Sequence, residues 1–425
     1  MKIALAHYSG TADISGVTTW LIGFSERLVD SGHEVVMHLH HFGNDPQQAS
    51  ILPSLQRLSI ETHSVRRIGS LEADTRQTLQ FLNQVQPALF LPQCLHAHYV
   101  AAAHAGRQGL PWIFTMHSDD PDYWCVAEAL TPETHGGSSV CVSQYLARQL
   151  RQRFPATDPQ VIPYGVTLPT IHATFSDQPF RVIFSGRLVE RQKCIQQVVH
   201  TLIDACRTSS QIEAHLIGDG PARASCEQLV HQASLADRIH FHGRVDPELV
   251  QPLLQRSQAI LLMSDFEGLP VALLEAMAVG VVPVVRAIES GIPELVQHER
   301  TGLLVPNDPA VAATALIRLS QNPDLWHHCS SNAHSLVEGT YSAGLCFERW
   351  EHLLSQKVGT AHHYFPIRTN HLRPSLPLSD PRFQAHVSSQ LPPAIRFQLR
   401  RLAGSIRRLF WRLVAALTNL GRHGR

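Results

Sequence analysis

The chain has 425 residues, 44% of them hydrophobic and 16% charged, which predicts a globular protein with two or three domains. Its 35 lysines and arginines balance its 35 acidic residues, and its eight cysteines include no C-x-x-C pair. This pattern argues against a disulfide framework or a cysteine zinc site and favours a reducing cytoplasm. Lys2–Ala6 is typical of a strand rather than a signal peptide, and no apolar run is long enough to cross a bilayer.

The first half of the chain alternates strands with helices. The opening strand, Ile3–His7, leads through the loop Ser9–Val17 into an amphipathic helix at Thr18–Asp30, which stops before Gly32. Such alternation predicts a parallel sheet with helices on both faces. The further strands that we predict are 35–40, 88–91, 112–116, 139–142 and 160–163, with helices at 97–107 and 144–153.

A second alternating block follows a loop-like stretch at 167–179. Each block has the size of one doubly wound domain, so we expect two α/β domains that face each other across a cleft at the carboxyl ends of their strands. We divide the chain into an N-terminal domain (1–170), a C-terminal domain (171–340) and a closing helix (341–356). The predicted strands of the second block are 181–184, 214–217, 239–242, 259–263, 282–285 and 302–305, separated by helices.

The loop after the strand 259–263 carries two carboxylates eight positions apart, Glu267 and Glu275. Gly268 predicts a tight turn and Pro270 a helix start, so Glu267 lies in the loop and Glu275 one to two turns into the helix. The unpaired N–H groups and the dipole of a helix start suit a phosphate. One carboxylate can then hold a sugar and the other a ribose. The alternative is an ordinary surface loop with a capping carboxylate.

Two cations follow the first strand of the second block, Arg187 next to Gly186 and Lys193 six positions later. Together they can neutralise a diphosphate leaving group, Arg187 through forked hydrogen bonds and Lys193 as a point charge. The alternative is a loop with solvated cations.

Glycine turns stand at two other strand ends. Gly218 allows close backbone approach to a ligand, or serves only a tight turn. Gly291 precedes Pro293 and Glu294 at a predicted helix start, whose N–H groups can bind phosphate. Glu294 otherwise only satisfies the dipole of that helix.

These motifs, in this order and at these strand ends, resemble retaining glycosyltransferase family 4, the group 1 glycosyltransferases of GT-B fold. The resemblance covers roughly residues 1–355. It implies two Rossmann-like domains and transfer of a sugar from a nucleotide-sugar donor with retention at the anomeric carbon, without a metal or other cofactor. The motifs that carry it are Gly186-Arg187-Leu188 with Lys193, Ile217-Gly218-Asp219-Gly220-Pro221, Glu267-Gly268-Leu269-Pro270 with Glu275-Ala276, and Gly291-Ile292-Pro293-Glu294 with Thr301-Gly302-Leu303.

The resemblance also implies roles for individual residues. Arg187 and Lys193 contact the donor diphosphate, and Glu267 contacts the donor sugar. The backbone N–H groups of Gly268 and Leu269 orient that sugar.

In the same way, the resemblance assigns Glu275 to the ribose hydroxyls. Gly16 matches the glycine-rich loop near the phosphates and the acceptor, and His117 matches a histidine near the donor sugar. The chain departs from the family at Ser15 and Cys194, where glycine is usual, and at Tyr164, where asparagine is common.

Glycosyl transfer passes through an oxocarbenium-like state while a diphosphate departs, so positive charge at the leaving group is the main requirement. Retention can use a carboxylate nucleophile or a front-face attack within an ion pair. Because no N-terminal carboxylate stands out as a nucleophile, we favour front-face attack.

Two histidine-containing regions raise the question of a metal. The segment 117–122 holds a histidine and three carboxylates, although Asp before Pro is ordinary turn chemistry. His38 and His40 share one face of a predicted strand and His41 lies elsewhere. We expect hydrogen-bonded or solvent-facing histidines and no metal.

The C-terminal tail is strongly basic. From residue 357 onward it has 12 basic and one acidic side chain, a net charge of +11. Residues 357–393 predict a flexible linker, and 394–425 predict a basic amphipathic helix with leucines on one side and arginines on the other. Such a helix fits the surface of an anionic membrane, or docks on its own domains or on a partner protein. We expect no nucleic-acid partner, because aromatic–basic interleaving is missing.

Two classes of function remain. The first is a retaining, metal-independent glycosyltransferase that acts on a glycan or lipid-linked acceptor at the cytoplasmic face of a membrane. The second is a catalytically inactive GT-B protein that binds a nucleotide or glycan and recruits partners. The presence of Arg187, Lys193, Glu267 and Glu275 favours the first class.

Overall fold

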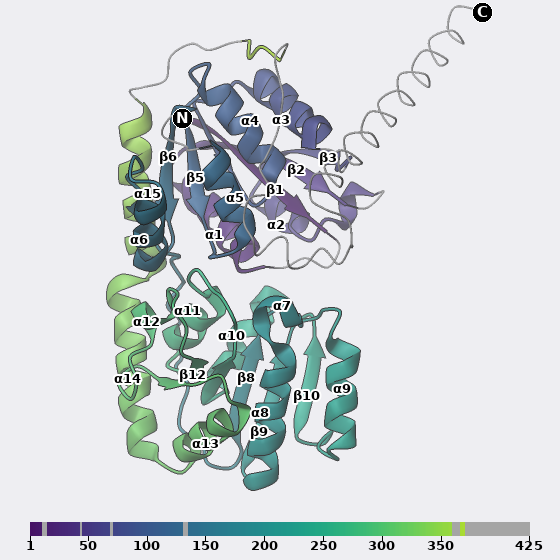
Figure 1. Cartoon of the computed structure of the whole chain (residues 1–425), viewed down its shortest axis with the longest axis vertical. Coiled ribbons are helices and arrows are strands. Elements are labelled where there is room, and N and C mark those ends of the chain that lie inside the picture. The colour runs from purple at the N-terminus through teal and green to yellow at the C-terminus, as the bar shows by residue number, and fades with distance from the viewer. Residues whose placement is uncertain (11–14, 43–44, 69–70, 131–134, 359–365, 370–425) are drawn as a thin grey trace, which may run out of the picture.

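The computed structural model describes residues 1–10, 15–42, 45–68, 71–130, 135–358 and 366–369. Two α/β domains lie one above the other, each built on a parallel sheet (Figure 1). This confirms the predicted fold class of two doubly wound domains. The predicted basic helix at 394–425 and most of the linker predicted at 357–393 lie outside the described residues.

The N-terminal domain has a seven-stranded parallel sheet in the order β3-β2-β1-β4-β5-β6-β7. Its central strands are uninterrupted apolar runs, as expected for parallel strands covered on both faces, and Ile3 to Ala6 are fully buried. The strands are β1 (Lys2–Ser9), β2 (Glu34–His41), β3 (Glu61–Arg66), β4 (Leu89–Pro92), β5 (Trp112–Met116), β6 (Gly137–Cys141) and β7 (Gln160–Val161). The helices are α1 (Gly16–Asp30), η1 (Pro46–Gln48), α2 (Leu52–Arg57), α3 (Leu71–Val85), α4 (His96–Gly106), α5 (Pro121–Leu130) and α6 (Gln144–Arg153).

The C-terminal domain has a six-stranded parallel sheet in the order β10-β9-β8-β11-β12-β13. The strands are β8 (Phe180–Ser185), β9 (Ile212–Ile217), β10 (Ile239–Gly243), β11 (Ala259–Leu262), β12 (Val282–Arg286) and β13 (Leu303–Val305). The helices are α7 (Glu190–Lys193), α8 (Ile195–Thr208), α9 (Arg223–Gln232), α10 (Pro247–Gln255), α11 (Val271–Ala278), α12 (Ile292–Leu295), α13 (Pro309–Ser320) and α14 (Pro323–Thr340).

The last described helix, α15 (Ala343–Val358), returns to the N-terminal domain (Figure 1). A β-bridge between Val166 and Ser342 joins the two segments that pass between the domains. Trp350 of α15 packs on Trp20 and Phe24 of α1, with ring centroids 5.9 and 5.0 Å apart. The end of the chain's second domain is therefore tied to the first by a buried aromatic contact.

The order of the strands reverses beside β1 in one domain and beside β8 in the other. At such a switch point the loops after neighbouring strands diverge and leave a crevice at the carboxyl edge of the sheet. The loops after β8 and β11 carry two of the four predicted motifs of the C-terminal domain, those of Arg187 with Lys193 and of Glu267. Within the described residues, no helix combines the length and the apolar character needed to cross a bilayer.

Candidate functional site

The structure brings the segment that carries Arg187 and Lys193 next to the loop that carries Glu267. Strands β8 and β11 are neighbours, so the loops that follow them meet at one edge of the sheet. The backbone N–H of Asp265 donates to the carbonyl of Gln192 at 2.9 Å, and the Gln192 amide donates to the carbonyl of Phe266 at 3.3 Å. These bonds fasten helix α7, which ends at Lys193, to the loop that carries Glu267.

Lys193 and Glu267 form a direct ion pair at the centre of this contact. The ammonium Nζ donates to Oε1 of Glu267 at 2.6 Å, and the two side chains are only 14% and 7% exposed. The geometry is that of a strong charge-assisted hydrogen bond. A phosphate that binds Lys193 must therefore compete with the Glu267 carboxylate for the same ammonium.

Arg187 stands beside this pair with its side chain exposed to solvent. Its guanidinium donates one hydrogen bond, to Oε1 of Gln192 at 3.0 Å. The loops at Gly186 and Gly218 pack backbone to backbone, because a Cβ on Gly218 would lie 1.9 Å from the carbonyl oxygen of Gly186. Both glycines have positive φ angles, +156° and +129°. The tight-turn interpretation of Gly218 therefore has a clear structural basis.

Helix α11 begins where the two domains touch. Its N-cap, Pro270, provides no side-chain hydrogen bond to the first N–H groups, and Leu269 before it is buried. A Cβ on Gly16 would lie 3.1 Å from Cγ2 of Val271. Gly16, the first residue of α1, thus packs against the first turn of α11 in the other domain.

The backbone of His117 contacts the loop that precedes α11, at Gly268. A Cβ on Gly268 would lie 2.1 Å from the His117 carbonyl oxygen. The His117 ring itself is buried and bonded inside its own domain, where Nδ1 accepts from the Tyr164 hydroxyl at 2.6 Å and Nε2 donates to Oε1 of Gln93. Burial lowers the pKa of His117 to about 3, so the ring is neutral. Because both ring nitrogens are bonded within the N-terminal domain, His117 contacts the C-terminal domain through its backbone carbonyl.

Glu294 bonds across the domain boundary. Its two carboxylate oxygens accept the backbone N–H groups of Gln144 and Tyr145, at 3.0 and 2.8 Å, and so cap helix α6 of the other domain. Nearby, the N–H of Gly291 donates to the carbonyl of Gly268 at 3.0 Å. In this arrangement Glu294 serves as a cap for a helix of the other domain, a role that neither predicted alternative included.

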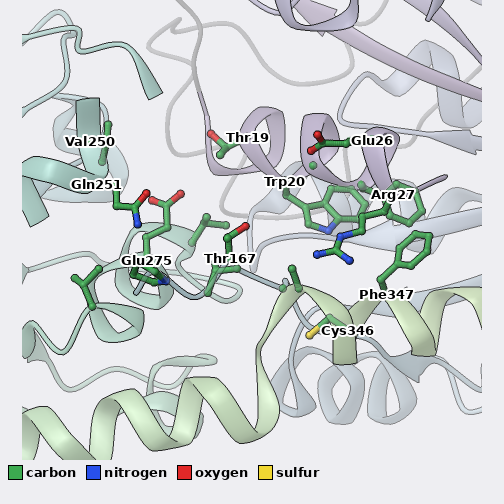
Figure 2. Close-up of a pocket in the computed structure, with 18 of the residues that line it drawn as sticks. Thr19, Trp20, Glu26, Arg27, Thr167, Val250, Gln251, Glu275, Cys346 and Phe347 are labelled. Carbon is green, nitrogen blue, oxygen red and sulfur yellow. The ribbon is translucent and has the colours of Figure 1, made fainter. Parts of the chain in front are cut away.

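Glu275 lies apart from Lys193 and Glu267. It faces a cavity of about 320 Å³ between α1, α10, α11 and α15, which Thr19, Gln251 and Thr167 also line (Figure 2). Arg187, Lys193 and Glu267 do not line this cavity. Burial raises the pKa of Glu275 to about 7. Its position within the second turn of α11 is as predicted. The two carboxylates have different neighbours, because Glu275 lines this cavity whereas Glu267 pairs with Lys193.

In the segment 117–122, Asp119 and Asp120 are engaged by side chains from outside the segment. Asp119 accepts from the Trp124 indole and the Tyr145 hydroxyl, and Asp120 pairs with Arg191 of the other domain at 3.8 Å. The expectation of hydrogen-bonded or exposed histidines is wrong for His38, because its ring is fully buried and neither nitrogen has a hydrogen-bond partner.

Sequence reasoning missed Gln93, which holds the ring of His117 from the end of β4. Its own Nε2 is buried without a partner. The available signal was its place directly after the carboxyl end of a buried strand, the same signal that identified Arg187 and Glu267. Tyr164, noted only as a departure from the family, is the second partner of His117.

Comparison with known proteins agrees with this geometry. Residues 14–168 match the family described as Glycosyltransferase Family 4, and residues 179–322 match Glycosyl transferases group 1, together well over half of the chain. The chain belongs to glycosyltransferase family 4. The two matches fall on the N-terminal and C-terminal sheets respectively.

Among curated relatives of this family 4 chain, the amylovoran biosynthesis glycosyltransferase AmsK of Erwinia amylovora is 37% identical over 155 residues. That alignment covers 34% of this chain and 37% of AmsK, so the chain matches only about a third of that relative's length.

Two solved structures resemble the family 4 chain over most of its length. HepE of Anabaena, in complex with UDP and glucose, has a TM-score of 0.68 at 18% identity and covers 84% of this chain and 99% of its own. TarM of S. aureus, in complex with fondaparinux, alpha-GlcNAc-glycerol and UDP, has a TM-score of 0.70 at 10% identity and covers 83% and 99%. These likenesses confirm the predicted GT-B fold.

Proposed function

We propose that this protein is a retaining glycosyltransferase that moves a sugar from a nucleoside-diphosphate-sugar donor to a glycan or lipid-linked acceptor in polysaccharide biosynthesis. The observation that carries the proposal is the meeting of Arg187, Lys193 and Glu267 at the switch point of the C-terminal sheet, directly opposite the His117 backbone. The family membership and the UDP complexes of HepE and TarM support a nucleotide-sugar as donor.

In the proposed reaction the donor diphosphate binds Lys193 and Arg187. Lys193 then releases Glu267, whose carboxylate becomes free to accept hydrogen bonds from hydroxyl groups of the sugar. The bond between the anomeric carbon and the diphosphate oxygen breaks as the acceptor oxygen attacks from the same face. The acceptor proton passes to the departing phosphate oxygen, and the two cations stabilise the negative charge that develops there.

We assign no divalent metal to this chemistry, since the cations Arg187 and Lys193 supply the positive charge that a metal would otherwise bring. Trapping a covalent glycosyl-enzyme intermediate would contradict the front-face attack. Loss of turnover when Mg²⁺ and Mn²⁺ are omitted would contradict the proposed metal independence of the transfer step.

The proposed location is the cytoplasmic surface of an anionic membrane. The support is the sequence of residues 394–425, with its arginines and leucines, in a chain whose net charge from residue 357 onward is +11. Flotation with vesicles containing phosphatidylglycerol tests this. The intact chain should bind them, and a 1–358 truncation should not. Equal behaviour of the two chains would contradict membrane binding.

The decisive experiment for the activity is release of nucleoside diphosphate over a panel of UDP-, GDP-, ADP- and dTDP-sugars with the purified full chain. Lys193→Met should lower turnover by about 100-fold or more, because it removes charge stabilisation that is worth about 3 kcal/mol or more in the transition state. Arg318→Met is the matched control, since Arg318 is an exposed cation of the same domain that pairs with Glu299. Nucleotide binding without turnover on any donor would instead support the inactive binding module.

A further inference from the structure

Three histidines meet in the interior of the N-terminal domain, away from the donor site. His38 and His40 lie on β2 and His98 lies on α4, and all three are fully buried. One ring nitrogen of each falls within 4.8 Å of the others. Three buried imidazoles that converge in this way form a donor set typical of a first-row transition metal.

The hydrogen bonds of His98 fix which of its nitrogens carries the proton. Its Nδ1 lies 3.2 Å from the backbone carbonyl of Gln93, which can only accept. Nδ1 therefore carries the hydrogen, and Nε2 presents a lone pair toward His40.

The hydrogen bonds of His40 lead to the same result from the opposite side. Its Nε2 lies 3.1 Å from Oε1 of Gln77, and the Gln77 amide nitrogen donates to the carbonyl of Arg66, which orients the amide. Nε2 of His40 thus donates to Gln77, and Nδ1 presents a lone pair. Nδ1 of His40 and Nε2 of His98 are 2.8 Å apart, so two lone pairs face each other.

His38 completes the cluster. Both of its ring nitrogens are buried without a hydrogen-bond partner, which is unusual for a polar group in a protein interior. The backbone of His63, its neighbour on β3, approaches the ring without a hydrogen bond of ordinary geometry. One ring nitrogen of His38 lies within the cluster, and the backbone of His63 is the acceptor beside the ring.

An extra proton shared between His40 and His98 would also relieve the facing lone pairs. It would, however, place a positive charge among three side chains that are fully buried, which is costly. A metal ion removes the conflict for all three residues at once. It accepts the converging lone pairs and leaves each remaining N–H for an acceptor, which is the usual outer arrangement of metal-bound histidines.

We propose that His38, His40 and His98 bind a divalent first-row transition metal, Zn²⁺ being the ion to test. Tetrahedral zinc with Zn–N distances of about 2.0–2.1 Å sets ligand nitrogens about 3.3–3.4 Å apart, so the 2.8 Å pair has to open by only about half an ångström. Gln77 and the carbonyl of Gln93 are the outer-shell acceptors.

The site is structural rather than part of the transfer chemistry. It joins β2 to α4 through residues 58 positions apart. It also holds the backbone of Gln93, whose side chain bonds the ring of His117. The metal would therefore stabilise the N-terminal domain and the support of His117 without contact with the donor.

The test is the zinc content of the untagged full-length chain, purified without chelator and measured by mass spectrometry, together with zinc-edge X-ray absorption. We expect about one zinc per chain, with three imidazole nitrogens at about 2.0–2.1 Å. Chelation should lower the melting temperature, and added Zn²⁺ should restore it. Because His98→Gln removes a ligand, it should reduce the zinc content to below about a tenth of the wild-type value.

Two further variants keep the test decisive even if His98→Gln fails to fold. Gln77→Leu alters only the outer shell at a half-buried position and should weaken zinc affinity by about 10–100-fold. His215→Gln is the matched control, because His215 also contacts two other histidines but pairs with Glu213 in the other domain. Wild-type protein that neither contains nor takes up zinc would overturn the proposal, as would zinc that His215→Gln removes and Gln77→Leu leaves in place.

Discussion

Gly268→Ala tests whether the two domains must close backbone to backbone for this protein to act. The added methyl would lie 2.1 Å from the carbonyl oxygen of His117 and 2.9 Å from Cα of Ser118, both in the other domain. Such contacts rarely fall below about 3 Å, so the two backbones have to separate by about 1 Å. Since the obstruction lies between the domains, each domain should still fold.

The magnitude follows from the bonds that a separation of about 1 Å breaks. Glu294 holds the N–H groups of Gln144 and Tyr145 at 3.0 and 2.8 Å, and both distances would pass the hydrogen-bond limit. Hydrogen bonds to a charged group contribute about 1.5–3 kcal/mol each, so the closed arrangement loses about 3–6 kcal/mol. That corresponds to a population shift of about 10²–10⁴-fold.

The assay combines small-angle X-ray scattering, nucleotide affinity and donor turnover. We expect Gly268→Ala to enlarge the radius of gyration and to lower kcat/KM by about 100-fold or more, with little change in thermal unfolding of either domain. Gly339→Ala is the matched control, because nothing lies within 4 Å of its added methyl in helix α14. This control should stabilise the protein by about 0.5–1 kcal/mol. An unchanged scattering profile and normal turnover in Gly268→Ala would refute the reasoning.

Three other predictions concern charged residues. Lys193→Met should destabilise the C-terminal domain by about 3–5 kcal/mol in urea unfolding, because it leaves the Glu267 carboxylate buried without its partner. The double variant Lys193→Met, Glu267→Gln should recover most of this free energy. Equal destabilisation of the single and the double variant would contradict a buried ion pair. Because burial raises the pKa of Glu275 from 4.5 to about 7, the folded state binds more protons than the unfolded state in that window. Its unfolding free energy should fall as pH rises from about 4.5 to 7, by at most about 3 kcal/mol, and Glu275→Gln should flatten the profile; parallel profiles would argue against this burial. Glu294→Gln should raise the donor KM about 10-fold, with Glu299→Gln, an exposed glutamate, unchanged as control.

Much of the fold was predictable because its central strands are apolar runs bounded by turn residues. Among the elements that were missed, β3 and α5 carry weak signals. Strand β3 is a half-buried edge strand of mixed polarity, ETHSVR, and therefore has no apolar run. Helix α5 begins at Pro121, where Asp before Pro indicated only a turn, although proline also suits a first helical turn.

The residues of the candidate site also differ in whether the sequence could predict their positions. The strand-end positions of Arg187, Lys193 and Glu267 were readable, because parallel strands bring their carboxyl ends to one edge. The bond of Glu294 to the other domain was not readable, since it depends on how the domains dock. Likewise, His98 reaches His38 and His40 only through the packing of α4 on the sheet.

The described segment 366–369 has a consequence for how the protein is tethered. Asn83 of α3 exchanges two hydrogen bonds with the backbone of Ile367, and Gln108 beyond α4 does the same for Arg368. Ile367 is 3% exposed. The chain therefore departs toward its C-terminus from the N-terminal domain. Any surface that residues 394–425 engage would therefore be linked to the protein through its N-terminal domain, and not directly through the domain that carries Lys193 and Glu267.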